Sequence, residues 1–79
     1  MISYKKLWIR LAEKEIKKTD LAQKAKFSGA TLAKLGKNEI VALKVLIDIC
    51  LVLGCDIGDI LEILPNENIS ETKITTSTE

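Results

Sequence analysis

Apolar residues recur at helical spacing along most of the first 64 of the 79 residues. They lie three or four positions apart, which is the period of an α-helix with one buried face. We expect the first such helix to be capped by Ser3 and to serve as scaffold. We expect its Trp8 to lie in the core, the alternative being an exposed ring that stacks on a base or docks a partner. The apolar stripe of this helix consists of Tyr4, Leu7, Trp8, Leu11 and Ala12.

Two shorter helical patterns follow between residues 16 and 38, with only a brief turn between them. Phe27 fills the corner, and Ser28 can cap the second helix by accepting a hydrogen bond from a free backbone N–H. Two short helices joined in this way predict a helix-turn-helix. The inward positions are Leu21, Ala22 and Ala25 on the first helix and Leu32 and Leu35 on the second. The outward positions of the second are Gly29, Ala30, Thr31, Ala33, Lys34 and Lys37.

Two further helices are predicted, and the first of them, over about residues 42–53, is apolar on nearly every side. Ile47 and Leu51, four residues apart, should form an exposed apolar strip, for which a partner is the simplest explanation. Asp56 should cap a short fifth helix over residues 57–63, which Pro65 ends. The inner face of the fourth helix is assigned Leu43, Leu46, Ile49, Cys50 and Leu53. The apolar residues divided between the core and the strip are Ile57, Ile60, Leu61 and Leu64.

The pattern resembles the lambda-repressor-like, Cro-type (XRE family) helix-turn-helix domain of bacterial and phage regulators. This resemblance implies an all-α fold, a compact five-helix bundle whose third helix enters the major groove while the second lies across the DNA backbone. We therefore expect a DNA-binding domain over residues 1–64 and a disordered polar tail over residues 65–79. The matching positions are Leu21, Ala22, Ala25, Phe27, Ser28, Thr31, Leu32, Leu35, Leu53 and Gly54.

Three positions depart from the family pattern. Lys17 stands where relatives commonly have a capping residue, so that Thr19 is the best cap near the start of the second helix. Lys26 stands where the turn usually has glycine. Either the turn is altered or Lys26 has a left-handed backbone, at a cost on the order of 1 kcal/mol. Asn38 replaces another usual glycine, and asparagine is the next best residue for a left-handed helix end.

Charge is distributed unevenly along the chain, although the net charge is only +1. Residues 1–55 contain eleven Lys and Arg residues against five acidic ones, whereas residues 56–79 contain one lysine against six acidic ones. Attraction to phosphate depends on the local electrostatic potential. The basic residues 1–55 therefore fit DNA binding better than the net charge of the whole chain suggests. The alternative is that these lysines only solvate the helix surfaces.

Composition argues against several other classes of protein. The chain has no histidine, and it shows no nucleophile beside a base, no phosphate-binding glycine loop and no carboxylate cluster, so we expect no enzyme. Cys50 and Cys55 cannot complete a zinc site, and we expect two buried thiols in a reducing cytoplasm. The apolar stretches are too short to span a membrane, and charges near the N-terminus argue against a signal peptide. We expect a soluble cytoplasmic protein without cofactor, metal or evident small-molecule ligand.

The resemblance implies that DNA contacts lie around the start of the third helix. Lys34 can donate to guanine and Ala30 can contact a thymine methyl, but Gly29 offers no donor where relatives often have Gln, Arg or Ser. The alternative is a helix that no longer reads sequence well. The residues expected to face bases or nearby phosphates are Ser28, Gly29, Ala30, Thr31 and Lys34. Those expected to contact the backbone around the groove are Lys18, Gln23, Lys37 and Asn38.

These observations lead to two functional hypotheses. The first is a sequence-specific transcriptional regulator, a repressor that binds double-stranded DNA as a homodimer, because one domain reads only about four or five base pairs. The second is an antitoxin-like or partner-binding scaffold whose apolar strip binds a different protein. In either case the predicted dimer or partner interface consists of Ile47, Leu51, Ile60 and Leu64.

Overall fold

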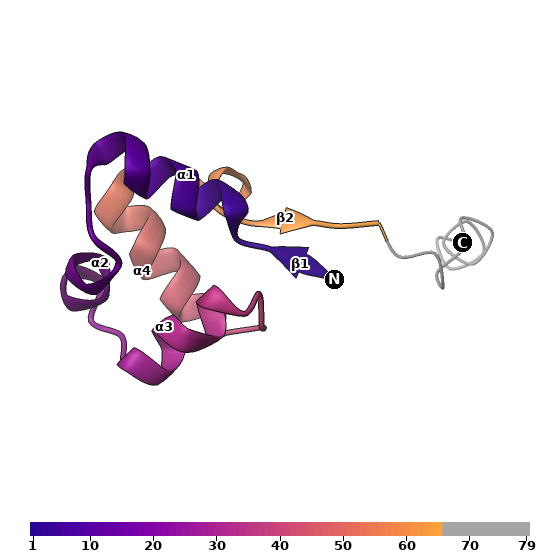
Figure 1. Cartoon of the computed structure of the whole chain (residues 1–79), viewed down its shortest axis with the longest axis horizontal. Helices are drawn as coiled ribbons and strands as arrows, with labels where there is room; N and C mark the ends of the chain where they lie inside the picture. The colour runs from indigo at the N-terminus through magenta and orange to yellow at the C-terminus, as the bar shows by residue number, and fades with distance from the viewer. Residues whose placement is uncertain (66–79) are drawn as a thin grey trace.

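The structure, a computed structural model, describes residues 1–65. Four α-helices form a bundle, and two short strands form a ribbon that projects from one end of it (Figure 1). The predicted tail over residues 65–79 lies outside the described residues except for Pro65. The elements in chain order are β1 (Ile2–Ser3), α1 (Lys5–Lys14), α2 (Lys18–Ala25), α3 (Gly29–Gly36), α4 (Leu43–Leu53), the 3-10 turn η1 (Ile57–Asp59) and β2 (Glu62–Ile63).

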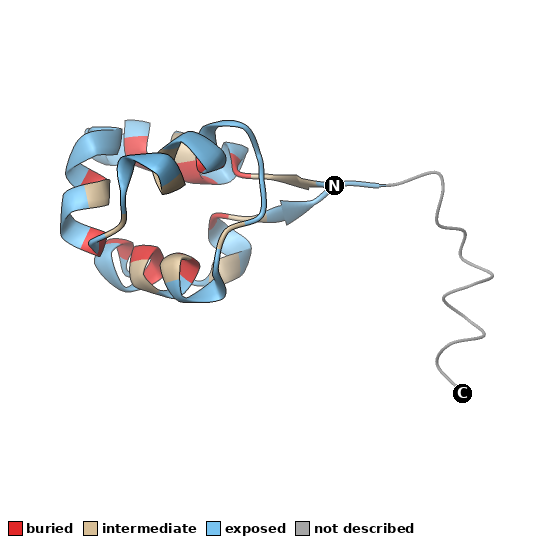
Figure 2. Ribbon diagram, turned by 90° about the horizontal axis from the view of Figure 1, so that it is seen from below, coloured by how far each residue is buried: buried red, intermediate tan, exposed pale blue. Residues whose placement is uncertain are grey.

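The core is mostly aliphatic, and Figure 2 shows that the buried positions of the four helices lie on the sides that face one another. Leu21 of α2, Leu35 of α3 and Ile49 of α4 have no exposed surface. Burying a side chain of this size stabilises the fold by about 1.5–3 kcal/mol, so the helical stripes predicted from the sequence account for much of the packing. The buried hydrophobic residues are Tyr4, Leu7, Leu11, Leu21, Ala25, Leu35, Leu46, Ile49, Cys50, Leu53 and Ile60.

Ser3, predicted to cap α1, lies in β1, and the cap position is Tyr4, which makes no side-chain cap hydrogen bond. Ser3 Oγ nevertheless accepts a hydrogen bond from the N–H of Lys5, the first residue of the helix, at 3.1 Å. Tyr4 lies just before the helix and is buried. Trp8 is half-buried and packs against the core with one side. Ala12, predicted to face inward, is exposed, because it lies on the rim of a cleft between the end of α1 and the start of α2.

The turn between α2 and α3 contains a strained residue. Lys26 has φ 60° and ψ 48°, which is the left-handed conformation that favours glycine. Of the two alternatives, the turn therefore has the left-handed conformation that a glycine would adopt there, and the lysine bears a cost on the order of 1 kcal/mol. Asn38, at φ 59°, occupies the left-handed position after α3 as predicted.

Replacing the strained lysine by glycine should stabilise the protein. In Lys26→Gly the relief of backbone strain should outweigh the free-energy cost of a more flexible unfolded chain. We therefore expect the free energy of unfolding to rise by about 0.5–1 kcal/mol. The control is Lys24→Gly, which removes the same side chain from the last turn of α2, where the backbone is helical, and should destabilise by up to about 1 kcal/mol. Thermal unfolding followed by circular dichroism measures both. If Lys26→Gly were less stable than the wild type, the Lys26 side chain would stabilise the fold by more than its left-handed backbone destabilises it.

α4 exposes more apolar surface than the sequence predicted. Ile47 and Leu51 are 44% and 75% exposed, which confirms the predicted strip. Leu43, predicted to face inward, is 60% exposed, because it is the first residue of α4 and Val41 packs against the core in its place. Leu43, Ile47 and Leu51 are spaced four apart and therefore form one stripe, called the α4 strip below.

The prediction of a fifth helix over residues 57–63 is wrong. Asp56 does begin a turn, in which the Asp59 carboxylate accepts the Asp56 N–H at 2.9 Å, but this turn is the short η1. The chain then extends into β2, which pairs antiparallel with β1 and places Ile2 opposite Ile63. Gly58 and the β-branched isoleucines disfavour a longer helix, and pairing with β1 satisfies backbone groups that a helix would have satisfied internally. Within residues 1–65 the fold is therefore mostly helical rather than all-α.

Because η1 and β2 replace the predicted fifth helix, one residue of the predicted interface is not on the surface. Ile60, expected at a partner surface, is fully buried, because η1 ends after three residues and directs Ile60 into the core. Leu64 is 36% exposed, but its N–H donates to the Met1 carbonyl at 2.9 Å. Leu64 therefore lies beside the start of the chain and does not lengthen the α4 strip.

The two cysteines lie at the end of α4 and just after it, as free thiols. Cys50 is buried as predicted, whereas Cys55 is only half-buried. Burial, with a smaller contribution from the neighbouring Cys55, raises the pKa of the Cys50 thiol to about 11. The Cys50 thiol therefore stays protonated near neutral pH. Among residues 1–65, no helix is long and apolar enough to cross a membrane.

Candidate nucleic-acid interface

The amino end of α3 is held by a local hydrogen-bond network. Ser28 Oγ accepts the Thr31 N–H at 3.1 Å, which confirms the predicted cap. The Ser28 hydroxyl in turn donates to Thr31 Oγ1 at 3.2 Å. The Thr31 hydroxyl keeps its own proton for a further acceptor, whereas the Ser28 hydroxyl is engaged on both sides. Of the two residues, Thr31 is thus better able to donate to a phosphate.

The outer face of α3 is lined by small residues and one long cation. Gly29, Ala30 and Lys34 are exposed, and Leu35 anchors the opposite face of the helix in the core. A Cβ atom added at Gly29 would have no neighbour within 4 Å. The three positions predicted to face base edges therefore share an unobstructed surface on which only Lys34 has a long donor.

The residues predicted to flank the groove differ in whether their side chains are already hydrogen-bonded within the protein. Lys18, Gln23 and Lys37 are exposed. Asn38 is exposed too, but its Oδ1 accepts the Tyr4 N–H at 3.0 Å. The Tyr4 hydroxyl also donates to the Glu39 carbonyl at 2.8 Å. Asn38 thus joins the end of α3 to the start of α1, a role that sequence reasoning missed because the two residues are 34 positions apart.

A second contact that sequence reasoning missed involves Lys18. Its Nζ lies 4.4 Å from the centroid of the Trp8 ring, within the range of a cation–π interaction. The contact joins α1 to the first residue of α2. Nothing in the local sequence indicates it, because the helical stripe that assigns Trp8 to the core does not tell which side of the indole stays exposed.

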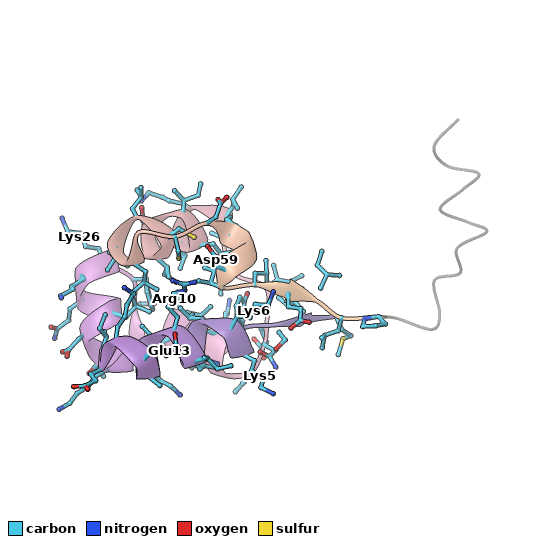
Figure 3. The ribbon with its side chains drawn as sticks, turned by 90° about the horizontal axis from the view of Figure 1, so that it is seen from above. Lys5, Lys6, Arg10, Glu13, Lys26 and Asp59 are labelled. Atoms are coloured by element: carbon cyan, nitrogen blue, oxygen red, sulfur yellow. The ribbon has the colours of Figure 1, made fainter. Side chains whose placement is uncertain are left out.

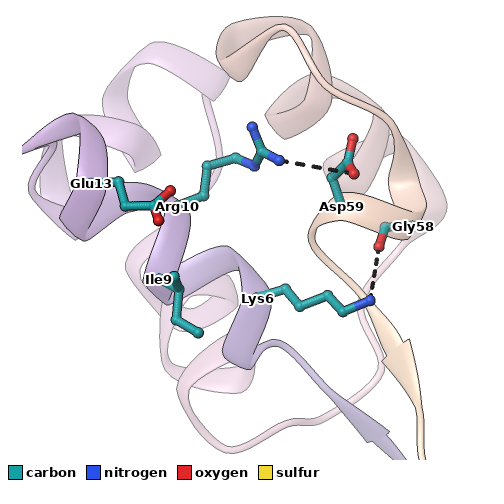
Figure 4. A pocket seen from close by; sticks show the side chains of 6 residues that line it. All are labelled: Lys6, Ile9, Arg10, Glu13, Gly58 and Asp59. Carbon is teal, nitrogen blue, oxygen red and sulfur yellow. Dashed lines mark hydrogen bonds and ion pairs between the residues drawn. The ribbon is translucent and has the colours of Figure 1, made fainter.

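Two of the basic residues counted in the sequence extend from α1 and contact η1. Arg10 reaches from α1 toward η1, where its guanidinium lies 3.8 Å from the Asp59 carboxylate (Figures 3 and 4). Lys6 Nζ donates to the Gly58 carbonyl at 3.3 Å (Figure 4). These side chains line a cleft of about 270 Å³ between α1 and η1. The basic charge available to an outside partner is therefore smaller than the sequence suggests and includes the lysines of α2 and α3.

A search among curated proteins gave no match. A family described as the Cro/C1-type HTH DNA-binding domain matches residues 6–66, which confirms the resemblance found in the sequence. Among solved structures, the Form II crystal structure of transcriptional regulator VanUg is similar to this chain, with 51% sequence identity and a TM-score of 0.79. The similarity covers 82% of this chain and 87% of that one. The chain therefore belongs to the Cro/C1-type helix-turn-helix DNA-binding domain family.

Proposed function

We propose that this protein is a sequence-specific transcriptional repressor that acts in the cytoplasm as a homodimer and inserts α3 into the major groove of DNA. The observation that carries this proposal is the capped and unobstructed amino end of α3, in a chain of the Cro/C1-type family. The similarity to transcriptional regulator VanUg supports it, since 51% identity over most of both chains favours a related role. Such a repressor would act by occupying a promoter and blocking polymerase.

In this proposal, base edges face three residues of α3. Lys34 donates to guanine O6 and N7, Ala30 contacts a thymine methyl, and Gly29 allows close approach without reading a base. Phosphates are bound by a second group of side chains around the groove. That group consists of Lys18, Gln23, Ser28, Thr31, Lys37 and Asn38. Because the Asn38 amide oxygen accepts the Tyr4 N–H, Asn38 would bind a phosphate through its amide nitrogen.

The homodimer is proposed to form through the α4 strip. Its three apolar side chains are exposed on successive turns of one helix, where isolated apolar residues would be ordinary but a continuous stripe is not. A two-fold axis across α4 would pair the strip with itself and bury it on both copies. Two copies then present two α3 helices to a palindromic site, with half-sites about one helical turn apart.

The α4 strip also supports a second candidate function. A different protein could cover the same three side chains, which would make the chain an interaction scaffold of the antitoxin-like kind. The two candidates differ in what the protein alone can do. A dimer that selects a palindrome favours the repressor, whereas a monomer with only nonspecific DNA affinity favours the scaffold.

The experiment that tests the proposal selects duplexes from a randomised pool and measures their affinity by fluorescence anisotropy over a salt series. We expect a palindromic sequence that binds at least about 10³-fold more tightly than random DNA. We also expect the logarithm of the association constant to fall with the logarithm of salt concentration, with a slope of several units, because bound lysines release counterions from phosphates. Weak binding without an enriched sequence would contradict the proposal.

The open space at Gly29 allows a change of specificity to be predicted. In Gly29→Gln, the new amide can reach adenine N6 and N7, and no atom within 4 Å of the added Cβ opposes it. We expect repeated selection to enrich adenine at one further position of each half-site, with a preference of about 1–3 kcal/mol. The control is Gly36→Gln at the other end of α3, which should leave the selected sequence unchanged. An unchanged preference in Gly29→Gln would place this residue away from the base edges.

A further inference from the structure

We infer that Trp8 is a positioning residue for DNA binding, because its ring holds the ammonium group of Lys18 where it contacts a DNA phosphate. This inference rests on the proposed function and deepens it, since Trp8 itself need not contact DNA. Trp8 lies on α1 and Lys18 begins α2, so the contact crosses between two helices. The 4.4 Å between Nζ and the ring centroid is well within the roughly 6 Å of a cation–π interaction.

The contact with the Trp8 ring suits a cation that must remain able to bind a phosphate. The ion pairs among residues 1–65 involve Arg10 and Lys44 but not Lys18. An acidic partner would neutralise the ammonium and would have to be displaced by a phosphate. The face of a neutral ring attracts the ammonium without cancelling its charge, and leaves the other donors of the ammonium for an anion.

The surroundings show that the ammonium remains accessible while it is restrained. Lys18 is exposed, and Trp8 is half-buried with one side against the core. Together they line a largely apolar cleft of about 410 Å³ between the end of α1 and the start of α2. A lysine has four rotatable bonds, so an ammonium that is already held in place loses less freedom when it binds a phosphate.

A double-mutant cycle on the full chain tests this inference, with affinity for the selected duplex measured over a salt series. Lys18→Gln should reduce the log–log salt slope by about one unit per subunit, as expected when one phosphate contact is lost. Trp8→Leu should weaken binding by up to about five-fold per half-site, because restraint of Lys18 can contribute no more than the strength of one exposed cation–π contact. In the Lys18→Gln background, Trp8→Leu should cause no further loss, because the ring then has no cation to hold.

The conservative variant Trp8→Phe keeps a smaller ring and should recover part of the affinity that Trp8→Leu loses. It also replaces Trp8→Leu in the cycle if thermal unfolding shows that the leucine variant does not fold. Equal losses on changing Trp8 with and without Lys18 would overturn the inference, since they would indicate a general packing role. Tighter binding by Trp8→Leu would overturn it as well, by showing that the ring withholds Lys18 from DNA. A wild-type protein that binds no duplex would instead overturn the proposed function along with the inference.

Discussion

Ile47→Asp is expected to dissociate the proposed dimer. Ile47 is the middle residue of the α4 strip, so a two-fold axis across α4 brings the two copies of this side chain close together. The substitution would place two carboxylates in an apolar contact, where like charges cost several kcal/mol. We expect the dimer dissociation constant to rise at least about 100-fold, measured by sedimentation over a range of protein concentrations. Affinity for the palindrome should fall with it, while nonspecific affinity persists.

A matched control for this experiment lies on α1. Ile9 is 48% exposed, close to the 44% of Ile47, and lies on the rim of the cleft between α1 and η1 (Figure 4). Ile9→Asp introduces the same charge at similar exposure and should leave the dimer intact. If Ile9→Asp dissociates the dimer and Ile47→Asp does not, the interface lies on α1 rather than α4. A wild-type protein that is monomeric at every concentration would assign the α4 strip to a different protein.

Lys34→Ala is expected to remove most of the sequence discrimination of α3. Lys34 is the only long side chain among the proposed base-reading residues, and it is exposed, so its loss should leave the fold and the dimer unchanged. A contact of this kind with guanine contributes about 1–3 kcal/mol, so each half-site should lose about 5- to 150-fold in affinity. The measurement is anisotropy with the selected duplex and with a duplex in which the contacted guanine is replaced. The variant should no longer distinguish the two.

The control for Lys34→Ala is Lys6→Ala, which removes the same charge from α1. Lys6 donates to Gly58 on η1 and is not part of the α3 surface (Figure 4). It should alter affinity for specific and random duplexes alike, and only slightly. An equal loss of affinity for both duplexes in Lys34→Ala would indicate that Lys34 binds a phosphate and that bases are read elsewhere.

Much of the helical bundle could be predicted from the sequence because the information is local. The period of the apolar residues placed Leu21, Leu35 and Ile49 in the core, and all three are fully buried. The Ser28 cap needs only residues three positions apart, and the left-handed Asn38 follows from its place after a helix. The exposure of the proposed DNA-reading face could be predicted for the same reason, whereas its contacts with DNA stay a prediction.

The errors arose where distant segments meet. Residues 57–63 have an apolar pattern compatible with a helix, but β1 at the other end of the chain offers an extended partner. That pairing ends the turn early and turns Ile60 into the core, so its place at an interface could not be predicted from its neighbours in sequence. Leu43 has the right helical phase to face inward, yet it lies past the end of the packed core.

The sequence by itself thus determined the helix-turn-helix, its cap and the apolar excess of α4, since each depends on residues within one or two turns of helix. Only the tertiary structure decided which polar and aromatic groups meet across helices. It placed Asn38 against Tyr4 and the Trp8 ring against Lys18. Such contacts depend on where whole helices pack, and helical periodicity fixes the buried face of each helix but not the neighbour that each exposed side chain finds.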